Sequence, residues 1–382
     1  IGSPDDLMCQ VRVLALSSVK ARVVVSIRPY NPEGVSFIHH IALLKEIAGW
    51  QVNKIDHVYL DKAPDHWVFS EYHRGDVCTV LASGGEEKDI ACKVGMASAA
   101  ATYLLKEGES EEIVIHVPLT KNKIKKESYV NDQSVAVEAW KEALKGACAL
   151  AIPDKHFQFL YEAAVHTMVL HSPKEVYPGP FVYRRFWFRD AAYILYALLA
   201  VGLKSRVRTA IDCFRKRQTA QGYFLSQEGE WDSNGEALWI MRQYCEMTGR
   251  TPPAEWKDSI KKAGRWIDKK RLSSMLALPH AGLLPSGFSA EHFGPNDFYY
   301  WDDFWGVAGL KAASFLCHAY KDKDEGDYFE KESQLLHESI NLSLRKIEEQ
   351  FKKPLIPASP YRRLDTGAIG CVAASYPLRV FE

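Results

Sequence analysis

The sequence of 382 residues predicts an α+β protein with two domains, an antiparallel β-sandwich followed by an array of α-helices. The length exceeds what one ordinary hydrophobic core needs. Short segments rich in β-branched residues fill residues 9–120, whereas from Pro153 onward apolar residues recur with helical period. Strands followed by a run of helices indicate separate layers or domains. We therefore divide the chain into a sandwich (1–120), a linker with one helix (121–150) and a helical domain (151–382).

The composition excludes several classes of protein. Lys plus Arg and Asp plus Glu balance at 48 each, so the basic field of a nucleic-acid-binding protein is missing. No apolar run approaches the roughly 20 residues that cross a bilayer, and no segment resembles a signal peptide. The eight cysteines form no CxxC pair, and the histidines have no metal-ligand spacing. We expect a cytoplasmic protein without metal, cofactor, membrane or nucleic-acid partner.

The sandwich is predicted from six segments separated by polar or Gly-containing turns. They read VRVLALSS, RVVVSIRPYN, HVYLDK, HWVFSEY, DVCTVLAS and EEIVIHVPL. Pro29 and Pro32 favour a strand end or a sheet edge near Tyr30. Short strands at near-regular spacing are typical of an antiparallel sandwich.

The helical part begins in the linker, where a helix is predicted around Ala136–Gly146 after the solvated stretch KNKIKKESYVNDQ. About seven further helices follow from Pro153, each with apolar residues at i, i+3, i+4 and i+7. The segments 190–203 and 302–320 are apolar nearly all round. Such helices are expected inside a layer of other helices.

Three junctions between a loop and a helix have an unusual composition. The segment 177–190 ends in RRFWFRD, 222–239 contains GEWDSNGEALW, and 291–305 ends in YYWDDFW. Each places carboxylates and an Arg or amide among Trp and Tyr residues, directly before an apolar helix. All three follow a helix, so in an array of helical hairpins they can lie on the same rim.

A sugar-binding pocket needs this mixture of side chains. Arg and carboxylate groups bind vicinal hydroxyls, and aromatic rings cover the apolar face of a pyranose. Inverting hydrolysis also needs a carboxylic acid that protonates the leaving oxygen and a carboxylate, roughly 6.5–9.5 Å away, that activates water. Apolar surroundings and a second carboxylate raise the pKa of such an acid.

The order of the three motifs resembles the six-hairpin, (α/α)6-toroid glycosidases, and is most similar to the glucoamylase family and its bacterial and archaeal relatives with an N-terminal β-sandwich. The resemblance implies that Arg189 and Asp190 bind the sugar at the non-reducing end. Trp301-Asp302-Asp303 corresponds to the family's Trp-Glu-Glu. It implies that Asp302 is the general acid and that Asp303 binds a sugar hydroxyl, although Asp reaches less far than Glu.

Asp232 is a second candidate for the general acid. The motif Glu230-Trp231-Asp232-Ser233 is similar to the Gly-Trp-Asp motif of trehalase-like members of the same fold. We favour Asp302, because it opens the helix where this fold carries its acid. Further sugar contacts are predicted for five residues: Trp187, Trp231, Glu236, Tyr300 and Trp301.

Simpler interpretations compete with these roles. Arg189 and Asp190 can form a buried ion pair with a helix cap, since Asp favours the N-cap position. Asp302 and Asp303 can likewise serve as caps favoured by the helix dipole. Each tryptophan, taken singly, is more typical of a core than of a sugar platform.

A full toroid has twelve helices, about five more than this sequence predicts, and the family's general base lies in the last hairpin. We therefore expect an incomplete toroid with the base outside this chain, and interpret DTGAIGCVAASYPLRVF (365–381) as the next loop and helix. A longer gene product, a homo-oligomer or a second chain would complete the ring.

The function expected from the sequence is inverting, exo-acting hydrolysis of α-linked glucosides. A glycoside phosphorylase on the same fold and a non-catalytic carbohydrate-binding or assembly protein remain alternatives.

Overall fold

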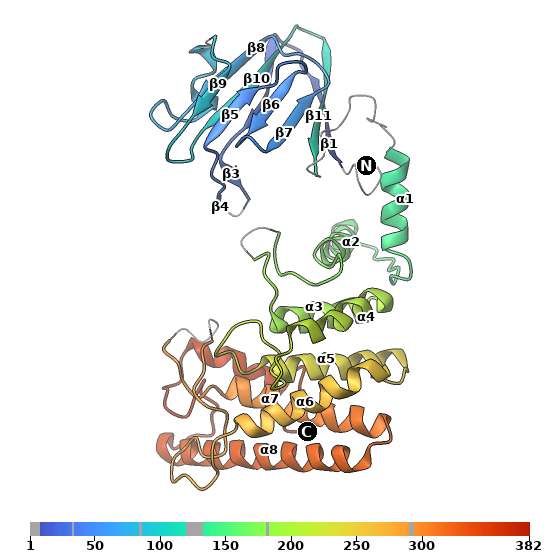
Figure 1. Cartoon of the computed structure of the whole chain (residues 1–382), viewed down its shortest axis with the longest axis vertical. Helices are drawn as coiled ribbons and strands as arrows, with labels where there is room; N and C mark the ends of the chain where they lie inside the picture. Colours follow the sequence, from blue (N-terminus) through green and yellow to red (C-terminus); the bar gives the residue numbers. More distant parts are fainter. Residues whose placement is uncertain (1–7, 33, 84–85, 120–132, 181–182, 290–293) are drawn as a thin grey trace. The chain divides into compact units, whose positions relative to one another are not determined.

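The computed structural model describes residues 8–32, 34–83, 86–119, 133–180, 183–289 and 294–382. They form two compact units, Ile1–Glu142 and Ala143–Glu382 (Figure 1). The boundary falls inside the predicted linker 121–150. The solvated part of that linker and the start of the third junction, residues 290–293, lie outside the described residues.

The first unit contains two antiparallel sheets, with strand orders β1-β11-β7-β6-β5-β9 and β2-β10-β8, and a small hairpin, β3-β4. The strands are β1 (Met8–Leu16), β2 (Ala21–Ile27), β3 (Tyr30–Asn31), β4 (Gly34–Val35), β5 (His40–Leu43), β6 (Gly49–Val52), β7 (Asp56–Leu60), β8 (His66–Ser70), β9 (Asp89–Ala91), β10 (Ser98–Leu105) and β11 (Ser110–Pro118). Trp50 and Ile113 of the larger sheet share one buried cluster with Phe69 and Tyr103 of the smaller sheet. The predicted antiparallel strand domain is confirmed.

Two segments of this unit differ from the prediction. DVCTVLAS forms 3-10 turns, Val77–Thr79 and Leu81–Ser83, because the Asp76 side chain accepts a hydrogen bond from the Cys78 backbone N–H. Such local side-chain bonds compete with strand pairing. Conversely, β10 has no predicted counterpart. Its alanine-rich sequence lacks strand propensity, and burial on both faces removes the alternation that marks a half-exposed strand.

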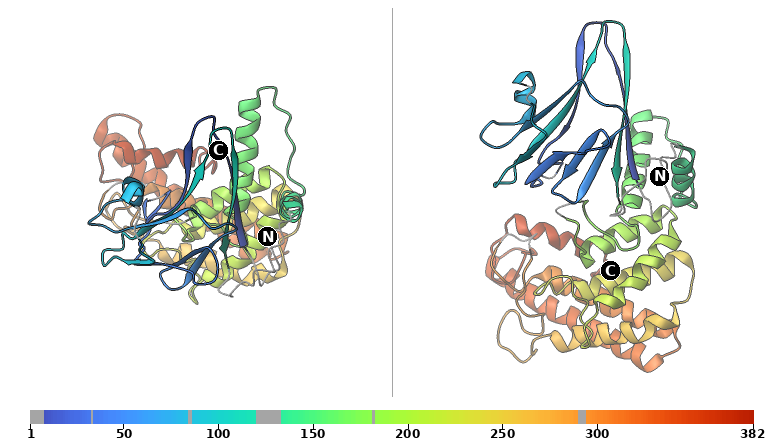
Figure 2. Two further views of the ribbon diagram at one scale, coloured as in Figure 1. Left: turned by 90° about the horizontal axis from the view of Figure 1, so that it is seen from above. Right: turned by 45° about the horizontal axis from the view of Figure 1, so that its top comes forward.

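The second unit contains seven α-helices among its described residues, which confirms the predicted number. They are α2 (Lys155–Leu170), α3 (Phe188–Ala200), α4 (Lys204–Cys213), α5 (Ser233–Thr248), α6 (Lys257–Lys270), α7 (Tyr300–Ala319) and α8 (Lys323–Phe351); α1 (Gln133–Ala143) spans the boundary between the units. α5 packs between α3 and α7, and α4, α6 and α8 pack against these three (Figure 2). The segment 365–381 forms a 3-10 helix, Thr366–Ala374, where a toroid helix was predicted.

The close approach of α5 and α7 depends on glycine. A Cβ atom on Gly235 would lie 2.1 Å from the Trp305 carbonyl oxygen. A Cβ on Gly309 would lie 2.6 Å from the Gly235 Cα. Any side chain at these positions would push the helices apart, so the two glycines bring the first turn of α5 close to α7.

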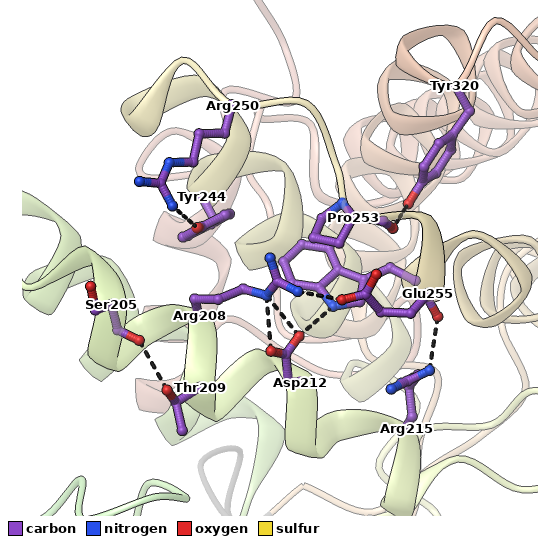
Figure 3. A network of polar contacts seen from close by, with 11 residues as sticks. Ser205, Arg208, Thr209, Asp212, Arg215, Tyr244, Arg250, Pro253, Glu255 and Tyr320 are labelled. Carbon is purple, nitrogen blue, oxygen red and sulfur yellow. Dashed lines mark hydrogen bonds and ion pairs between the residues drawn. The ribbon is translucent and has the colours of Figure 1, made fainter.

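A polar network ties the helices together beyond the C-terminal ends of α5 and α7 (Figure 3). Asp212 of α4 accepts two hydrogen bonds of 2.9 Å from Arg208 Nε and one of 2.7 Å from Trp256 Nε1. Arg208 also pairs with Glu255, and the Tyr320 hydroxyl donates to the Pro253 carbonyl. The acidic loops described next lie at the opposite, N-terminal ends of these helices.

Candidate active site

The three predicted junctions meet at Asp232. Its Oδ2 accepts a hydrogen bond of 2.8 Å from Trp301 Nε1 and one of 3.2 Å from Arg189 Nη1. Arg189 Nη2 also lies 3.5 Å from Glu230 Oε1. Side chains separated by 43 and 69 positions in the sequence thus share one carboxylate.

We call five residues the carboxylate cluster: Arg189, Glu230, Asp232, Glu236 and Asp302. The last four are buried, with exposed fractions of 3%, 3%, 0% and 1%. Among the described residues, neither oxygen of Glu236 nor Oδ2 of Asp302 has a hydrogen-bond partner. Arg189 therefore contributes one positive charge to a group of four buried carboxyl groups.

The helix starts position these groups. Glu236 and Asp302 stand in the first turns of α5 and α7, and Asp190 stands in the first turn of α3. A helix N-terminus carries partial positive charge and favours nearby carboxylates. The N-cap residues of α3 and α7 are Trp187 and Tyr299, so Asp190, Asp302 and Asp303 are first-turn residues and not N-caps.

Burial shapes the electrostatics of the cluster. It is the largest cause that raises the pKa of Glu236 and of Asp302 well above the usual carboxyl range, and the neighbouring charge of Asp232 adds to both shifts. Arg189 opposes the shift but does not cancel it. Both shifts favour the protonated form of these carboxyl groups, while Asp232 accepts hydrogen bonds from a guanidinium and an indole.

Asp303 contacts a different part of the unit. It is fully buried, and its Oδ1 accepts a hydrogen bond of 2.8 Å from the Leu284 backbone N–H. Burial raises the pKa of Asp303 to about 8, although that hydrogen bond and the charge of Arg271 oppose the shift. Asp303 thereby fixes the loop before α7; its predicted contact with a sugar hydroxyl stays a prediction.

Asp303→Asn is expected to flatten the pH dependence of stability. Because the folded-state pKa lies above the unfolded value of about 3.9, the unfolded chain releases the proton first, and stability falls by about 1.4 kcal/mol per pH unit between these two values. Asn keeps an acceptor for Leu284 and does not titrate. Urea unfolding at pH 5, 6, 7 and 8 should give a shallower decline for the variant; equal slopes would contradict the raised pKa.

The predicted aromatic contacts separate into two groups. Trp301 is 8% exposed and bonds to Asp232, and half-buried Trp187 lies under the Arg185 guanidinium, 4.9 Å from the ring centroid. Trp231 instead packs into a core cluster, with its Nε1 bonded to the Ser286 carbonyl. Tyr300 is fully buried, and its hydroxyl pairs with Ser343 of α8. The structure therefore brings Trp301 to the cluster and places Trp231 and Tyr300 in helix packing.

Glu230 of the carboxylate cluster and Tyr193 beside it had no predicted role. Glu230 was noted only as part of a motif, yet it faces Arg189. Tyr193 follows Arg189 by one helical turn and forms an edge-to-face pair with Trp305, with ring centroids 5.9 Å apart. Burial and then the charge of Glu236 raise the pKa of Tyr193. The i, i+4 spacing on α3 is the sequence signal that places Tyr193 beside Arg189.

The described residues contain neither a candidate metal site nor a candidate membrane-spanning helix. Within the described ranges, no three or more His, Cys, Asp or Glu side chains are grouped so that they could hold a metal ion. Likewise, none of the helices that the structure describes combines the length and apolar character needed to cross a membrane.

Comparison with known sequences gives one informative relative. No family model matches the chain. An uncharacterized glycosyl hydrolase of Methanocaldococcus jannaschii is 26% identical over 212 residues, which cover 52% of this chain and 32% of that protein. The chain thus spans about a third of the length of this curated relative.

Comparison with solved structures shows the fold. A bacterial glucoamylase complexed with acarbose aligns with a TM-score of 0.59 and 12% identity, over 86% of this chain and 52% of the glucoamylase. A rhamnosidase from Klebsiella oxytoca with rhamnose bound aligns with a TM-score of 0.51 and 10% identity, over 95% of this chain and 80% of that protein. The predicted resemblance to the six-hairpin glycosidases is confirmed at the level of the fold.

Proposed function

We propose that this chain carries the sugar-binding and proton-donating part of a glycoside hydrolase site that removes α-linked glucose by inversion. One observation supports this most: the carboxylate cluster holds buried Asp302, whose pKa is raised, near Asp232, which is bonded to Arg189 and Trp301. A carboxyl group whose pKa is raised by burial, beside groups that bind hydroxyls, is typical of the donor half of such a site.

Asp302 is the proposed general acid. It gives its proton to the glycosidic oxygen as the bond from that oxygen to the anomeric carbon breaks, and water adds to the opposite face of the sugar. Asp232 is the weaker candidate, because its Oδ2 already accepts hydrogen bonds from Arg189 and Trp301. The base that takes the proton from water is placed outside these 382 residues, in keeping with a chain that spans 52% of the aligned glucoamylase.

The proposed sugar contacts are Arg189, Asp190, Trp187 and Trp301. Arg189 offers a planar fork of donors, and the two indoles offer faces for a pyranose. Asp302 is 1% exposed, so a sugar must displace neighbouring side chains to reach it. This burial favours a second candidate function, a carbohydrate-binding protein without catalysis.

Azide provides a test that does not depend on the base. The chain is incubated with α-glucosyl fluoride or 4-nitrophenyl α-glucoside, with and without azide, and the products are identified by NMR. Azide is a small nucleophile that needs no general base. Azide-stimulated turnover with β-glucosyl azide as product is expected, because attack from the side opposite the leaving group inverts the anomeric carbon.

Each other outcome points to a different function. Turnover that requires phosphate and yields glucose 1-phosphate indicates a phosphorylase. Turnover of 4-nitrophenyl α-rhamnoside, without turnover of the glucoside, would indicate that the substrates are α-rhamnosides. Binding of maltose without turnover under any condition supports the non-catalytic candidate. Rapid hydrolysis of maltose by this chain without azide would show that the base lies within it.

A further inference from the structure

A pocket of about 380 Å³ lies further along α3, α5 and α7 and is also lined by residues 376–379, beyond the last 3-10 helix. Its polar lining includes Arg242, Gln243 and Glu246 of α5, Lys311 of α7 and Arg379. Its aromatic lining consists of Tyr196 of α3, Trp239 of α5 and Tyr376. None of its lining residues belongs to the carboxylate cluster.

A series of contacting aromatic rings separates this pocket from the carboxylate cluster. Trp301 and Trp305 form an edge-to-face pair with centroids 5.7 Å apart, and Trp239 contacts Trp305 at 5.6 Å. Tyr196 continues the series at 5.1 Å from Trp239. Trp305 is fully buried and Trp239 is 5% exposed, so the rings form a packed layer. This pocket is therefore distinct from the carboxylate cluster, although both lie on the same helices.

The pocket carries excess positive charge. Glu246 is its one lining carboxylate, and it pairs with Arg242 at 2.9 Å. Arg379 has a partner in Glu382 at 3.7 Å, but both side chains are more than two-thirds exposed, where such pairs contribute little. Within the described part of the chain, no ion pair involves Lys311. Burial and then the charge of Lys311 lower the pKa of neighbouring His337.

We propose that this pocket binds an anionic sugar, either a sugar phosphate or a sugar acid. Lys311 and Arg379 supply charge for the anion, since ammonium and guanidinium groups are the usual partners of phosphate and carboxylate. Tyr196, Trp239 and Gln243 supply rings and an amide for the sugar body. The volume falls within the range of small-molecule sites.

The Arg242 side chain is held in place by neighbouring residues, in a position where it can contact a bound anion. Its guanidinium is bonded to Glu246 and lies 5.1 Å from the centroid of the Phe315 ring. A cation held in place before the ligand arrives loses less conformational freedom on binding. The sugar part of the ligand rests on the proposed function, whereas the anion part rests on the charges alone.

Isothermal titration calorimetry of the full chain tests the proposal with four probes: glucose 1-phosphate, glucuronate, glucose and inorganic phosphate. One of the two anionic sugars should bind more tightly than glucose or phosphate, and the better of the two identifies the anion. Lys311→Met should weaken that binding by about 10-fold to 100-fold, as expected for loss of a charged hydrogen bond. Arg379→Gln, at an exposed position, should weaken it less without a risk to folding.

Two controls make the result decisive. Lys331→Met removes an exposed lysine from α8 and should leave affinity unchanged. Asp302→Asn should bind the anionic sugar as the wild type does, even if the proposed hydrolase activity is absent. Equal affinity in wild type and Lys311→Met, no binding of either anionic sugar, or loss of binding in Asp302→Asn would overturn the proposal. Equal affinity for phosphate and glucose 1-phosphate would overturn its sugar part.

Discussion

Asp302→Asn is expected to slow azide-supported cleavage of maltose by about 10²-fold to 10⁴-fold, the usual contribution of a general acid. The same variant should cleave α-glucosyl fluoride nearly as fast as the wild type. Fluoride leaves without proton transfer to a sugar oxygen, whereas the glucose released from maltose must be protonated as it departs. Initial rates on both substrates, measured at one azide concentration, give the comparison.

The pH profile adds a second readout for Asp302. A general acid works only while protonated, so the rate on maltose should fall as pH rises through the raised pKa of Asp302. The rate on the fluoride should not show this fall. Asp232→Asn is the matched variant, since it changes the neighbouring carboxylate and keeps its size. If Asp232→Asn alone loses maltose and spares the fluoride, Asp232 is the acid.

The sequence predicts the helices and the convergence of the loops for a physical reason. Helical period is local, so α5 and α7 can be located from residues a few positions apart. Their parallel packing then brings Asp232 and Trp301 to the same end. The hydrogen bond between Trp301 and Asp232 joins residues 69 positions apart, so no local sequence pattern can predict it.

Helical periodicity could not predict which side chain each residue of a motif contacts. Tyr300 and Trp301 are adjacent in the sequence, yet Tyr300 bonds to Ser343 on α8 while Trp301 bonds to Asp232. Successive helical residues point about 100° apart, so adjacent residues of one motif reach different partners. Asp302 and Asp303 also have different partners. Asp302 belongs to the carboxylate cluster, whereas Asp303 accepts a hydrogen bond from the Leu284 backbone N–H.

The carboxylate cluster is not explained by a contribution to folding stability. Four buried carboxyl groups around a single guanidinium would be replaced by apolar side chains at little cost, because burial of charge is unfavourable unless every group is paired. Strongly shifted pKa values that arise from burial plus a nearby charge are typical of functional sites. Glu236, with no hydrogen-bond partner among the described residues, fits a side chain whose partner arrives with the ligand.

Arg189→Met is expected to destabilise the second unit by about 3–5 kcal/mol, the usual cost when one partner of a buried ion pair is removed. The Arg189 side chain is 13% exposed, and those of Glu230 and Asp232 are 4% exposed, so water cannot replace the guanidinium. Urea unfolding at pH 7, followed by far-ultraviolet circular dichroism, measures the loss. Arg185→Met, which removes an exposed guanidinium from the same loop, is the matched control.

The loss should depend on pH in a defined direction. A buried carboxyl group without a cationic partner is unfavourable mainly in its charged form, so the loss of Arg189 costs most where the cluster is ionised. The folded variant then binds more protons than the unfolded chain, and the destabilisation grows as pH rises above the usual carboxyl range of about 4. Near pH 4 the variant should approach the wild type. A deficit independent of pH would show that Arg189 acts through packing and not through its charge.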